Sequence, residues 1–381
     1  MKTHLRFIFL ASFFFSLHMA LLAYLNSSML SQFASPTTIS IVYTVASVLS
    51  LILVSIAPSI VRRIGAFRFI SCALLSSGAL LYLISTHTGS AIVPFFVLYF
   101  SLNSVVLYGL DLFLEHYSSE GQTGNIRGLY LTFGNIGWVA APIISTTLQS
   151  TLGFSVIYIV AACAVGASLV VMFSSQRGFV DKAYNTSSLL DGLRILRRHK
   201  NIRLITTLNL LLQLFFVVMV IYSPIYLTTV IGFSWKALGI LLTAMLLPFV
   251  IFPYPTGYIA DKYLGEKELM ITGLLIMGLA TLYFANLGQS TLVLYAVTLF
   301  STRVGASILE EMCDSAFFKQ VSDADSAVIS IYRNMMPFAY TIGPLIAGAV
   351  FALTSYYVLF NILGVLMILA TLIALQIKDS R

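Results

Sequence analysis

One apolar stretch of the sequence carries a cation and three carboxylates at regular spacing. These side chains of the stretch 290–316 are Arg303, Glu310, Glu311 and Asp314. On a helix, which turns by about 100° per residue, Arg303, Glu310 and Asp314 fall within roughly 40° of one another. A buried carboxylate can bind and release a proton or form an ion pair, and a guanidinium can hold an anionic group with two hydrogen bonds. The stripe therefore predicts proton transfer, anion binding or a lock made of paired charges.

The stretch 91–116 repeats the acidic part of this stripe. Asp111 and Glu115 precede Glu310 and Asp314 by 199 residues each. Within each pair the spacing is four residues, so both carboxyl groups share one face of a helix. Two interpretations stay open for these four carboxylates. They either pair with basic residues at neighbouring helix ends and lock one state, or Asp111 or Glu310 couples protons.

The composition says which elements must position these charges. The chain has 381 residues, of which 59% are hydrophobic and 9% charged, whereas a soluble domain carries about 25% charged residues. The mean hydropathy is +0.95. An integral membrane protein follows, and soluble enzymes, nucleic-acid binders and secreted disulfide scaffolds are excluded. The three cysteines have no C-x-x-C spacing, so we expect no zinc or redox site and no cofactor.

Membrane-spanning helices need about 20 apolar residues each, and twelve such stretches fit the chain. They are 6–28, 37–60, 67–87, 91–116, 127–150, 153–174, 203–230, 235–259, 268–288, 290–316, 327–352 and 355–377. The first is long enough to span, so we expect it to be retained rather than cleaved as a signal peptide. With the N-terminus inside, 19 of the 21 basic residues fall on the inner side, Lys236 falls outside, and Arg303 lies within a span. The positive-inside rule therefore predicts cytoplasmic termini.

Polar composition marks a boundary in the middle of the chain. We expect a six-helix bundle over 1–175, a cytoplasmic linker over 176–203 and a second bundle over 204–381. Leucines at helical spacing from Leu189 to Leu196, beside a basic cluster, predict an amphipathic helix on the membrane surface within the linker. A plain linker is the favoured interpretation, and a lipid-binding regulatory role is the alternative.

The segment from Gly257 to Lys267 resembles a signature of the major facilitator superfamily. It matches the pattern G-x-x-x-D-[RK]-x-x-G-x-[RK], with Gly257, Asp261, Lys262, Gly265 and Lys267 at the defined positions. The resemblance implies that this loop forms an inner gate, in which the glycine permits close helix packing and the charges pair.

The first half holds a degraded counterpart of this segment. Arg62, Arg63 and Gly65 are retained, but Val61 stands where the acid is expected and Pro58 lies near the expected glycine. Gly65 and Gly265 are 200 residues apart, in line with the repeat of the acidic pairs.

The resemblance further implies twelve helices in two pseudo-symmetric six-helix bundles, an all-helical membrane fold. It also implies a secondary transporter that moves a small solute by alternating access, as a functional monomer in the plasma membrane. The first, fourth, seventh and tenth helices would line the cavity, which makes cavity candidates of His18, Asn103, Asn209, Gln213 and Arg303. Arg303 would either bind an anionic group of the solute or neutralise Glu310. Protons are the candidate coupling ion, and no nucleic acid is expected as a partner.

Other functions remain open at this point. A drug/proton antiporter-type exporter is the nearest alternative, although the Gly-Pro pair of such exporters is missing from the fifth span, where Pro142 follows Ala141. A membrane-embedded transferase has one hint, the Asp323-Ala324-Asp325 sequence, and a transporter-shaped sensor is the third alternative. No Walker sequence is present to bind ATP, so an ion or solute gradient would have to supply the energy.

Overall fold

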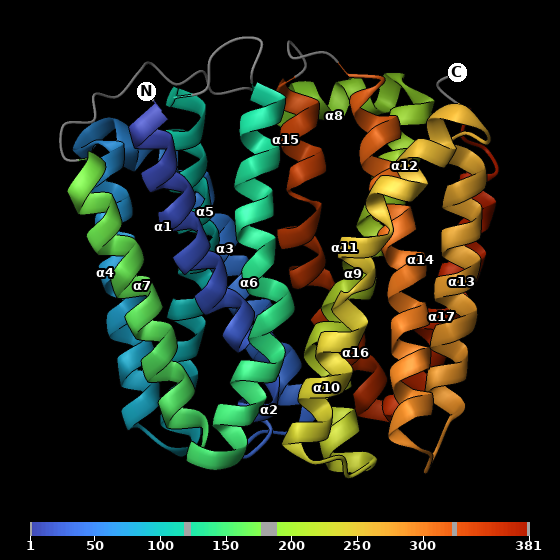
Figure 1. Cartoon of the computed structure of the whole chain (residues 1–381), viewed down its shortest axis with the longest axis horizontal. Coiled ribbons are helices and arrows are strands. Elements are labelled where there is room, and N and C mark those ends of the chain that lie inside the picture. The colour runs from blue at the N-terminus through green and yellow to red at the C-terminus, as the bar shows by residue number, and fades with distance from the viewer. Residues whose placement is uncertain (1, 118–122, 177–188, 322–325, 379–381) are drawn as a thin grey trace. The chain divides into compact units, whose positions relative to one another are not determined.

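Helices form all the regular structure in the described part of the chain, and no strand occurs there. The structure is a computed structural model that describes residues 2–117, 123–176, 189–321 and 326–378 (Figure 1). For 115–117 and 123–136, and at 254 and 261 among other places, it describes the backbone alone. Asp323-Ala324-Asp325 lies outside the described residues. Contacts divide the chain into two units, each described below by itself.

Unit 1 comprises Met1–Asn185 and Ser234–Gly239. Its elements are α1 (Lys2–Ala23), α2 (Asn26–Leu30), α3 (Pro36–Ile64), α4 (Ala66–Thr86), η1 (Gly89–Ala91), α5 (Ile92–Tyr117), α6 (Thr123–Leu152) and α7 (Phe154–Gln176). Helix α4 packs between α5 and α7, α1 packs against α6 and α7, and α3 packs against α5. Trp235 joins this unit by packing edge-on against Phe154, with 5.4 Å between the ring centroids.

Unit 2 comprises Thr186–Phe233 and Ile240–Arg381. Its elements are α8 (Leu189–Arg198), α9 (Lys200–Ile225), η2 (Tyr226–Val230), α10 (Trp235–Leu246, which begins in unit 1), α11 (Pro248–Ile251), α12 (Pro253–Lys262), α13 (Glu266–Asn286), α14 (Leu292–Phe318), α15 (Ser326–Arg333), α16 (Met335–Leu353) and α17 (Tyr356–Ala374). Helix α13 packs between α14 and α17, α9 packs against α16 and α17, and α12 packs against α14. These are the pairings of unit 1 repeated in the same chain order.

Eleven helical runs among the described residues are long and apolar enough to cross a membrane. They correspond to eleven of the twelve predicted spans. The remaining predicted span, 127–150, lies in α6, whose first part is described in its backbone only.

Two of the predicted spans are broken in unit 2. The span predicted over 235–259 is divided into α10, α11 and α12, with Pro248 and Pro253 beginning the second and third pieces. A proline has no backbone N–H and its ring clashes with the carbonyl four residues earlier, so the helix breaks there. The span predicted over 327–352 is divided into α15 and α16 at Asn334, whose φ and ψ are −80° and 1°. By contrast, α3 and α6 are continuous in unit 1 although they contain Pro58 and Pro142.

Equivalent glycines turn the chain in both units. Gly65 joins α3 directly to α4 with a φ of 86°, and Gly265 precedes α13 with a φ of 126°. Side chains other than glycine rarely adopt these angles, because the Cβ atom clashes with the backbone. The sequence repeat therefore reflects a repeated turn.

Candidate functional site

Arg303 lies in the interior of unit 2, and 1% of its surface is exposed. Its guanidinium carbon is 5.3 Å from the ring centroid of Phe215 and 5.5 Å from that of Phe216, both on α9. Desolvated contacts between a cation and an aromatic ring contribute about 2 kcal/mol. The positive charge of Arg303 also acts on the carboxylate of Glu310 along the same helix. The rings of α9 and the acidic part of α14 thus surround one buried cation.

The three carboxylates of α14 interact with one another. Glu310, Glu311 and Asp314 are each half-buried, and the negative charges of Asp314 and Glu311 both act on Glu310. Repulsion among carboxylates is relieved when one of them takes up a proton. Two cations oppose these three acids, Arg303 acting on Glu310 and Arg333 acting on Asp314, so the stripe keeps one excess negative charge that a proton can offset.

Hydrogen bonds extend this stripe to α9 and α15. The Tyr332 hydroxyl donates to Oδ1 of Asp314 at 2.7 Å, and the Tyr332 ring stacks on Phe317 with 3.9 Å between centroids. Nδ2 of Asn209 donates to the Tyr332 carbonyl at 3.3 Å, and Nε2 of Gln213 donates to Oδ1 of Asn209 at 3.2 Å. Asn209 and Gln213 therefore connect, through Tyr332, to Asp314 and to the helix break at Asn334.

The polar groups predicted in unit 1 gather in a neutral cluster. His18 on α1 and Asn103 on α5 are both buried, and the side chain of Asn103 lies beside His18 and Tyr99. The rings of His18 and Tyr99 are 6.0 Å apart, and Nδ1 of His18 is hydrogen-bonded to the Phe15 carbonyl. This cluster holds no carboxylate among its described members.

The cluster continues toward α2 and α7. Tyr158 on α7 donates to Oδ1 of Asn26 at 2.7 Å, and it lies close enough to Tyr99 for the two hydroxyls to interact electrostatically. Asp111, the acid predicted to match Glu310, is exposed, and the side chain of Glu115 lies outside the described part. Unit 1 thus offers a burial site for uncharged polar groups where unit 2 buries charge.

Comparison with known proteins identifies the family. The sequence matches the Major Facilitator Superfamily model over residues 8–242 and 234–380. The chain belongs to the Major Facilitator Superfamily. Its fold is similar to the crystal structure of an auto-inhibited POT family peptide transporter, with a TM-score of 0.78, 9% sequence identity, and coverage of 99% of this chain and 97% of that chain. A search of curated proteins gives no match to the sequence.

Membership confirms the predicted fold and the predicted class of function. The protein is an all-helical, multi-pass membrane protein with the superfamily's fold, and it is a secondary transporter for a small molecule.

The structure describes contacts for one charged residue of the superfamily signature in unit 2. Lys262 donates to the Tyr258 hydroxyl at 2.7 Å and lies over the rings of Tyr258 and Tyr263. Lys267 is half-buried, and the side chain of Asp261 lies outside the described part. A Cβ atom on Gly257 would lie 3.7 Å from Oε1 of Glu311, so this glycine faces the acidic stripe.

The ion pair beside this signature involves two residues that the sequence did not point to. Nζ of Lys319 is 2.6 Å from Oε1 of Glu266, whose side chain is 3% exposed, and the Ser315 hydroxyl donates to the same oxygen at 3.3 Å. This contact joins the start of α13 to the end of α14. In unit 1, Arg62 and Arg63 are exposed at the end of α3, and Nε of Arg62 donates to the Pro58 carbonyl at 3.4 Å.

Other partners also escaped prediction, because they come from distant parts of the chain. They are Tyr99, Tyr158 and Asn26 in unit 1, and Phe215, Phe216 and Tyr332 in unit 2. The sequence held no specific signal for Tyr332. The abundant phenylalanines gave none, because most of them pack or face lipid.

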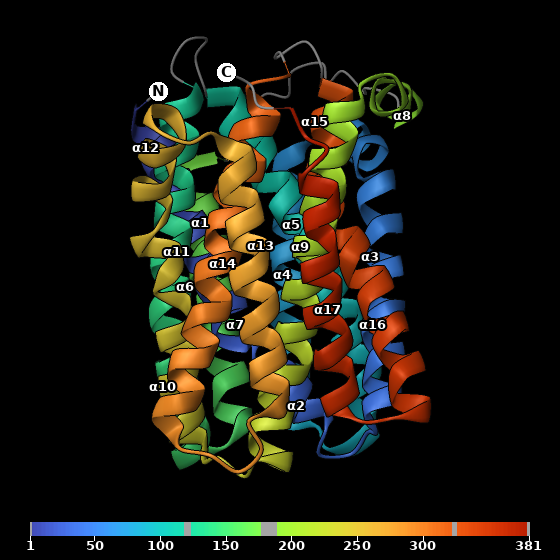
Figure 2. The ribbon, with the colours of Figure 1, turned by 90° about the vertical axis from the view of Figure 1, so that its right-hand side faces the viewer.

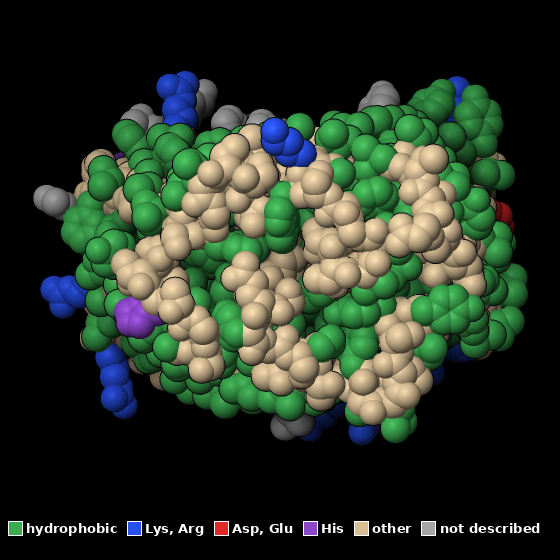
Figure 3. All heavy atoms as spheres, turned by 90° about the horizontal axis from the view of Figure 1, so that it is seen from below, with side chains coloured by type: hydrophobic (Ala, Val, Ile, Leu, Met, Phe, Trp, Pro, Cys, Tyr) green, Lys and Arg blue, Asp and Glu red, His purple; other side chains and the backbone are tan. Residues whose placement is uncertain are grey.

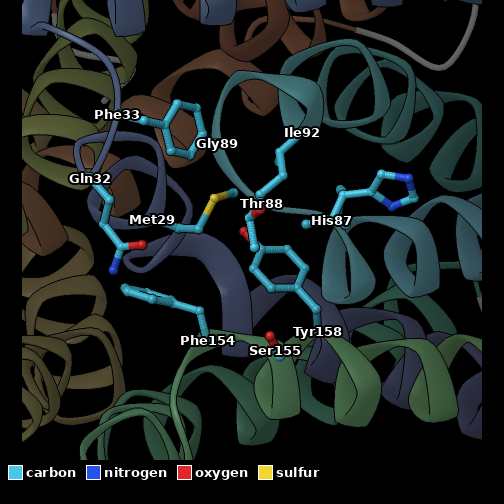
Figure 4. A pocket seen from close by; sticks show the side chains of 11 residues that line it. Met29, Gln32, Phe33, His87, Thr88, Gly89, Ile92, Phe154, Ser155 and Tyr158 are labelled. Carbon is cyan, nitrogen blue, oxygen red and sulfur yellow. The ribbon is translucent and has the colours of Figure 1, made fainter.

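Unit 1 also contains a cavity of about 110 Å³ near the ends of α2, α4 and α7. Figure 4 shows Met29, Phe33, Ile92 and Phe154 around it, together with the ring of Tyr158. Only Tyr158 belongs both to this cavity and to the neutral cluster. The residues predicted to contact the solute do not line it.

Proposed function

We propose that this transporter moves its solute by alternating access and couples the movement to protons at Glu310. The observation that carries the proposal is the stripe on α14, where a buried Arg303 and the half-buried Glu311 and Asp314 all act electrostatically on Glu310. Charged groups within membrane spans cost about 2.5–3.5 kcal/mol to insert, so such a stripe is retained for a function. Asp111 is the weaker candidate because its side chain is exposed.

Transport in proteoliposomes tests this assignment once a ligand screen by thermal shift has supplied a solute. We expect Glu310→Gln to abolish uptake driven by a pH gradient while leaving counterflow exchange intact, because only net transport needs the proton to cycle. Glu268→Gln is the matched control, since Glu268 is an exposed glutamate in the first turn of α13. Uptake by Glu310→Gln that still follows the pH gradient would exclude Glu310 as the coupling residue. Loss of counterflow as well would assign Glu310 to a lock instead.

Solute recognition is proposed for Arg303 with Asn209 and Gln213 in unit 2, and for His18 with Asn103 in unit 1. Each group combines hydrogen-bonding side chains in the interior of a unit. The functional unit is proposed to be the monomer, and we propose that no chemical reaction accompanies transport. Formation of a product without flux of the solute would overturn the last point.

The protein is proposed to lie in the plasma membrane, with both termini in the cytoplasm. The basic residues support this, and the end of the molecule that Figure 3 shows carries few charged side chains. In a variant with the native cysteines replaced, a membrane-impermeant maleimide should label Gln289→Cys in intact cells. Lys200→Cys should be labelled only after lysis. The opposite pattern would invert the topology.

A further inference from the structure

Helix α8 lies across the end of α9 rather than in line with it. Its axis runs across the page in Figure 1 and toward the viewer in Figure 2, whereas α9 stands upright in both. His199 makes the turn, with φ and ψ of −103° and 95°. Because the span of α9 begins at Lys200, α8 must lie at the membrane surface.

The segment 189–203 is strongly basic. It contains five basic side chains and one acidic side chain, Asp191. The basic residues Arg194, Arg197, Arg198, Lys200 and Arg203 are all exposed. Arg203 donates to the Arg197 carbonyl at 3.2 Å, which folds the start of α9 against the end of α8 and draws these cations together.

Apolar side chains accompany these cations. Leu193, next to Arg194, is 48% exposed, and Ile195 and Leu196 are half-buried. An exposed leucine beside exposed arginines matches a membrane interface, where the leucine enters the acyl region and the arginines meet the head groups.

Packing holds the helix in this position. Helix α8 contacts α15 and α9 within unit 2. Helix α15 carries Tyr332, which donates to Asp314. The segment is therefore a docked surface element that leads, through α15, to the acidic stripe.

We infer that the basic segment 189–203 binds the head groups of anionic phospholipids. Basic side chains close to a membrane surface are attracted by anionic lipids, and a cluster of four to eight of them is typical of such binding. Five cations at the end of a span meet this condition. A plain linker that only obeys the positive-inside rule would show no preference for anionic lipid over zwitterionic lipid.

Tryptophan quenching by brominated lipids can test this on the full chain. The sequence has two tryptophans, Trp138 and Trp235. With both replaced by phenylalanine, Leu193→Trp places one reporter on α8. The vesicles contain four parts of phosphatidylcholine to one part of phosphatidylglycerol. In one set the phosphatidylglycerol carries the bromine, and in the other set an equal amount of phosphatidylcholine carries it. We expect stronger quenching by the brominated phosphatidylglycerol, and equal quenching would overturn the inference.

Charge variants in the same reporter background identify the cause. Arg197→Gln with Arg198→Gln is expected to lower the preference for phosphatidylglycerol by about 25-fold, since each basic side chain near the surface contributes roughly fivefold. Arg197→Lys with Arg198→Lys should keep the preference, because the charge remains. Arg62→Gln with Arg63→Gln, an exposed pair at the end of α3, should also keep it. An unchanged preference in the first variant, or an equal loss in the Arg62 and Arg63 control, would refute the assignment.

The lipid preference at high salt concentration tests the same inference without any substitution of the arginines. Raising the salt to 1 M shortens the screening length to about 3 Å, so the preference of the reporter protein should disappear. A preference that persists at 1 M salt would exclude head-group charge as its source. None of these measurements depends on solute flux, so they stand apart from the proposed coupling at Glu310.

Discussion

Units 1 and 2 share one scheme of helix packing but bury different chemistry. In unit 1, α3 and α6 run unbroken, and the buried polar side chains among those the structure describes are neutral ones such as His18 and Asn103. In unit 2, the corresponding helices are broken, and the buried stripe on α14 is charged. A repeat can therefore keep its backbone pairings while one copy acquires the charges and the breaks. This difference is why we propose coupling in unit 2, and substitutions matched between the units can test that proposal.

The largest expected difference concerns the buried cation. Arg303→Met removes the positive charge that acts on the Glu310 carboxylate. Removal of one member of a buried charge pair costs about 3–5 kcal/mol, so we expect uptake to fall at least about a hundredfold. His18→Gln, in the neutral cluster, should lower it by less than about tenfold, since a neutral buried hydrogen bond contributes about 1 kcal/mol.

Arg303→Lys separates charge from shape in this comparison. It keeps the positive charge but loses the planar group over Phe215 and Phe216. We expect solute affinity to fall more than thermal stability does, as measured by binding and by unfolding of the same sample. Similar losses in Arg303→Met and His18→Gln would remove the functional distinction between the units.

A second difference concerns how closely equivalent helices approach. At the α13–α14 contact, a Cβ atom on Gly305 would collide with backbone atoms of Gly273 and Met277. At the matching α4–α5 contact, a Cβ atom on Gly109 would meet only the side chain of Ile70, at 3.0 Å. A side chain can move and a backbone cannot, so Gly305→Ala should destabilise by about 3 kcal/mol and Gly109→Ala by about 1 kcal/mol.

Unfolding of the purified variants in a denaturing detergent measures both values. Gly166→Ala on α7 is the control, because nothing lies within 4 Å of the added Cβ atom. Equal destabilisation by Gly305→Ala and Gly109→Ala would mean that the two contacts are mechanically alike.

The smallest expected difference separates two buried tyrosine hydroxyls. Tyr332→Phe removes a hydrogen bond to the Asp314 carboxylate, and Tyr158→Phe removes one to the Asn26 amide. Hydrogen bonds to charged groups contribute about 1.5–3 kcal/mol and neutral ones about 0.5–1.5 kcal/mol. The unfolding free energy should therefore drop more for Tyr332→Phe. A larger drop for Tyr158→Phe would indicate that Asp314 is uncharged in the folded protein.

Local patterns in the sequence predicted most of the spans, the repeat of Gly65 at Gly265, and the amphipathic helix that became α8. These features depend on apolar length, glycine and helical spacing, which short segments encode. The stripe on α14 was also predictable, because its members lie on one helix. The prolines of 253–255 gave a sign of the break in α10–α12 that the hydropathy count alone overlooked.

Contacts between distant segments could not be predicted in the same way. Lys319 pairs with Glu266 across 53 residues, and Phe215 meets Arg303 across 88. The packing of distant segments decides which residues become partners. The sequence contains many basic and aromatic residues, and nothing in it tells which of them will form these contacts. The break at Asn334 also involves a distant partner, since the carbonyl of Tyr332, two residues earlier, accepts a hydrogen bond from Asn209 on another helix.

The glycine contact of α13 with α14 has a mechanical consequence. A second contact of this type joins α13 to α17 at Gly278 and Gly364, where a Cβ atom on Gly278 would lie 2.9 Å from the Gly364 carbonyl oxygen. Helices that approach this closely at glycines interlock at those points, so we expect these three to move together. Bending in unit 2 is then left to its hinges, the breaks within α10–α12 and at Asn334. The second of these hinges lies two residues from Tyr332, which donates to Asp314. If the proposed proton coupling holds, a proton taken up by the acidic stripe would therefore act close to this hinge.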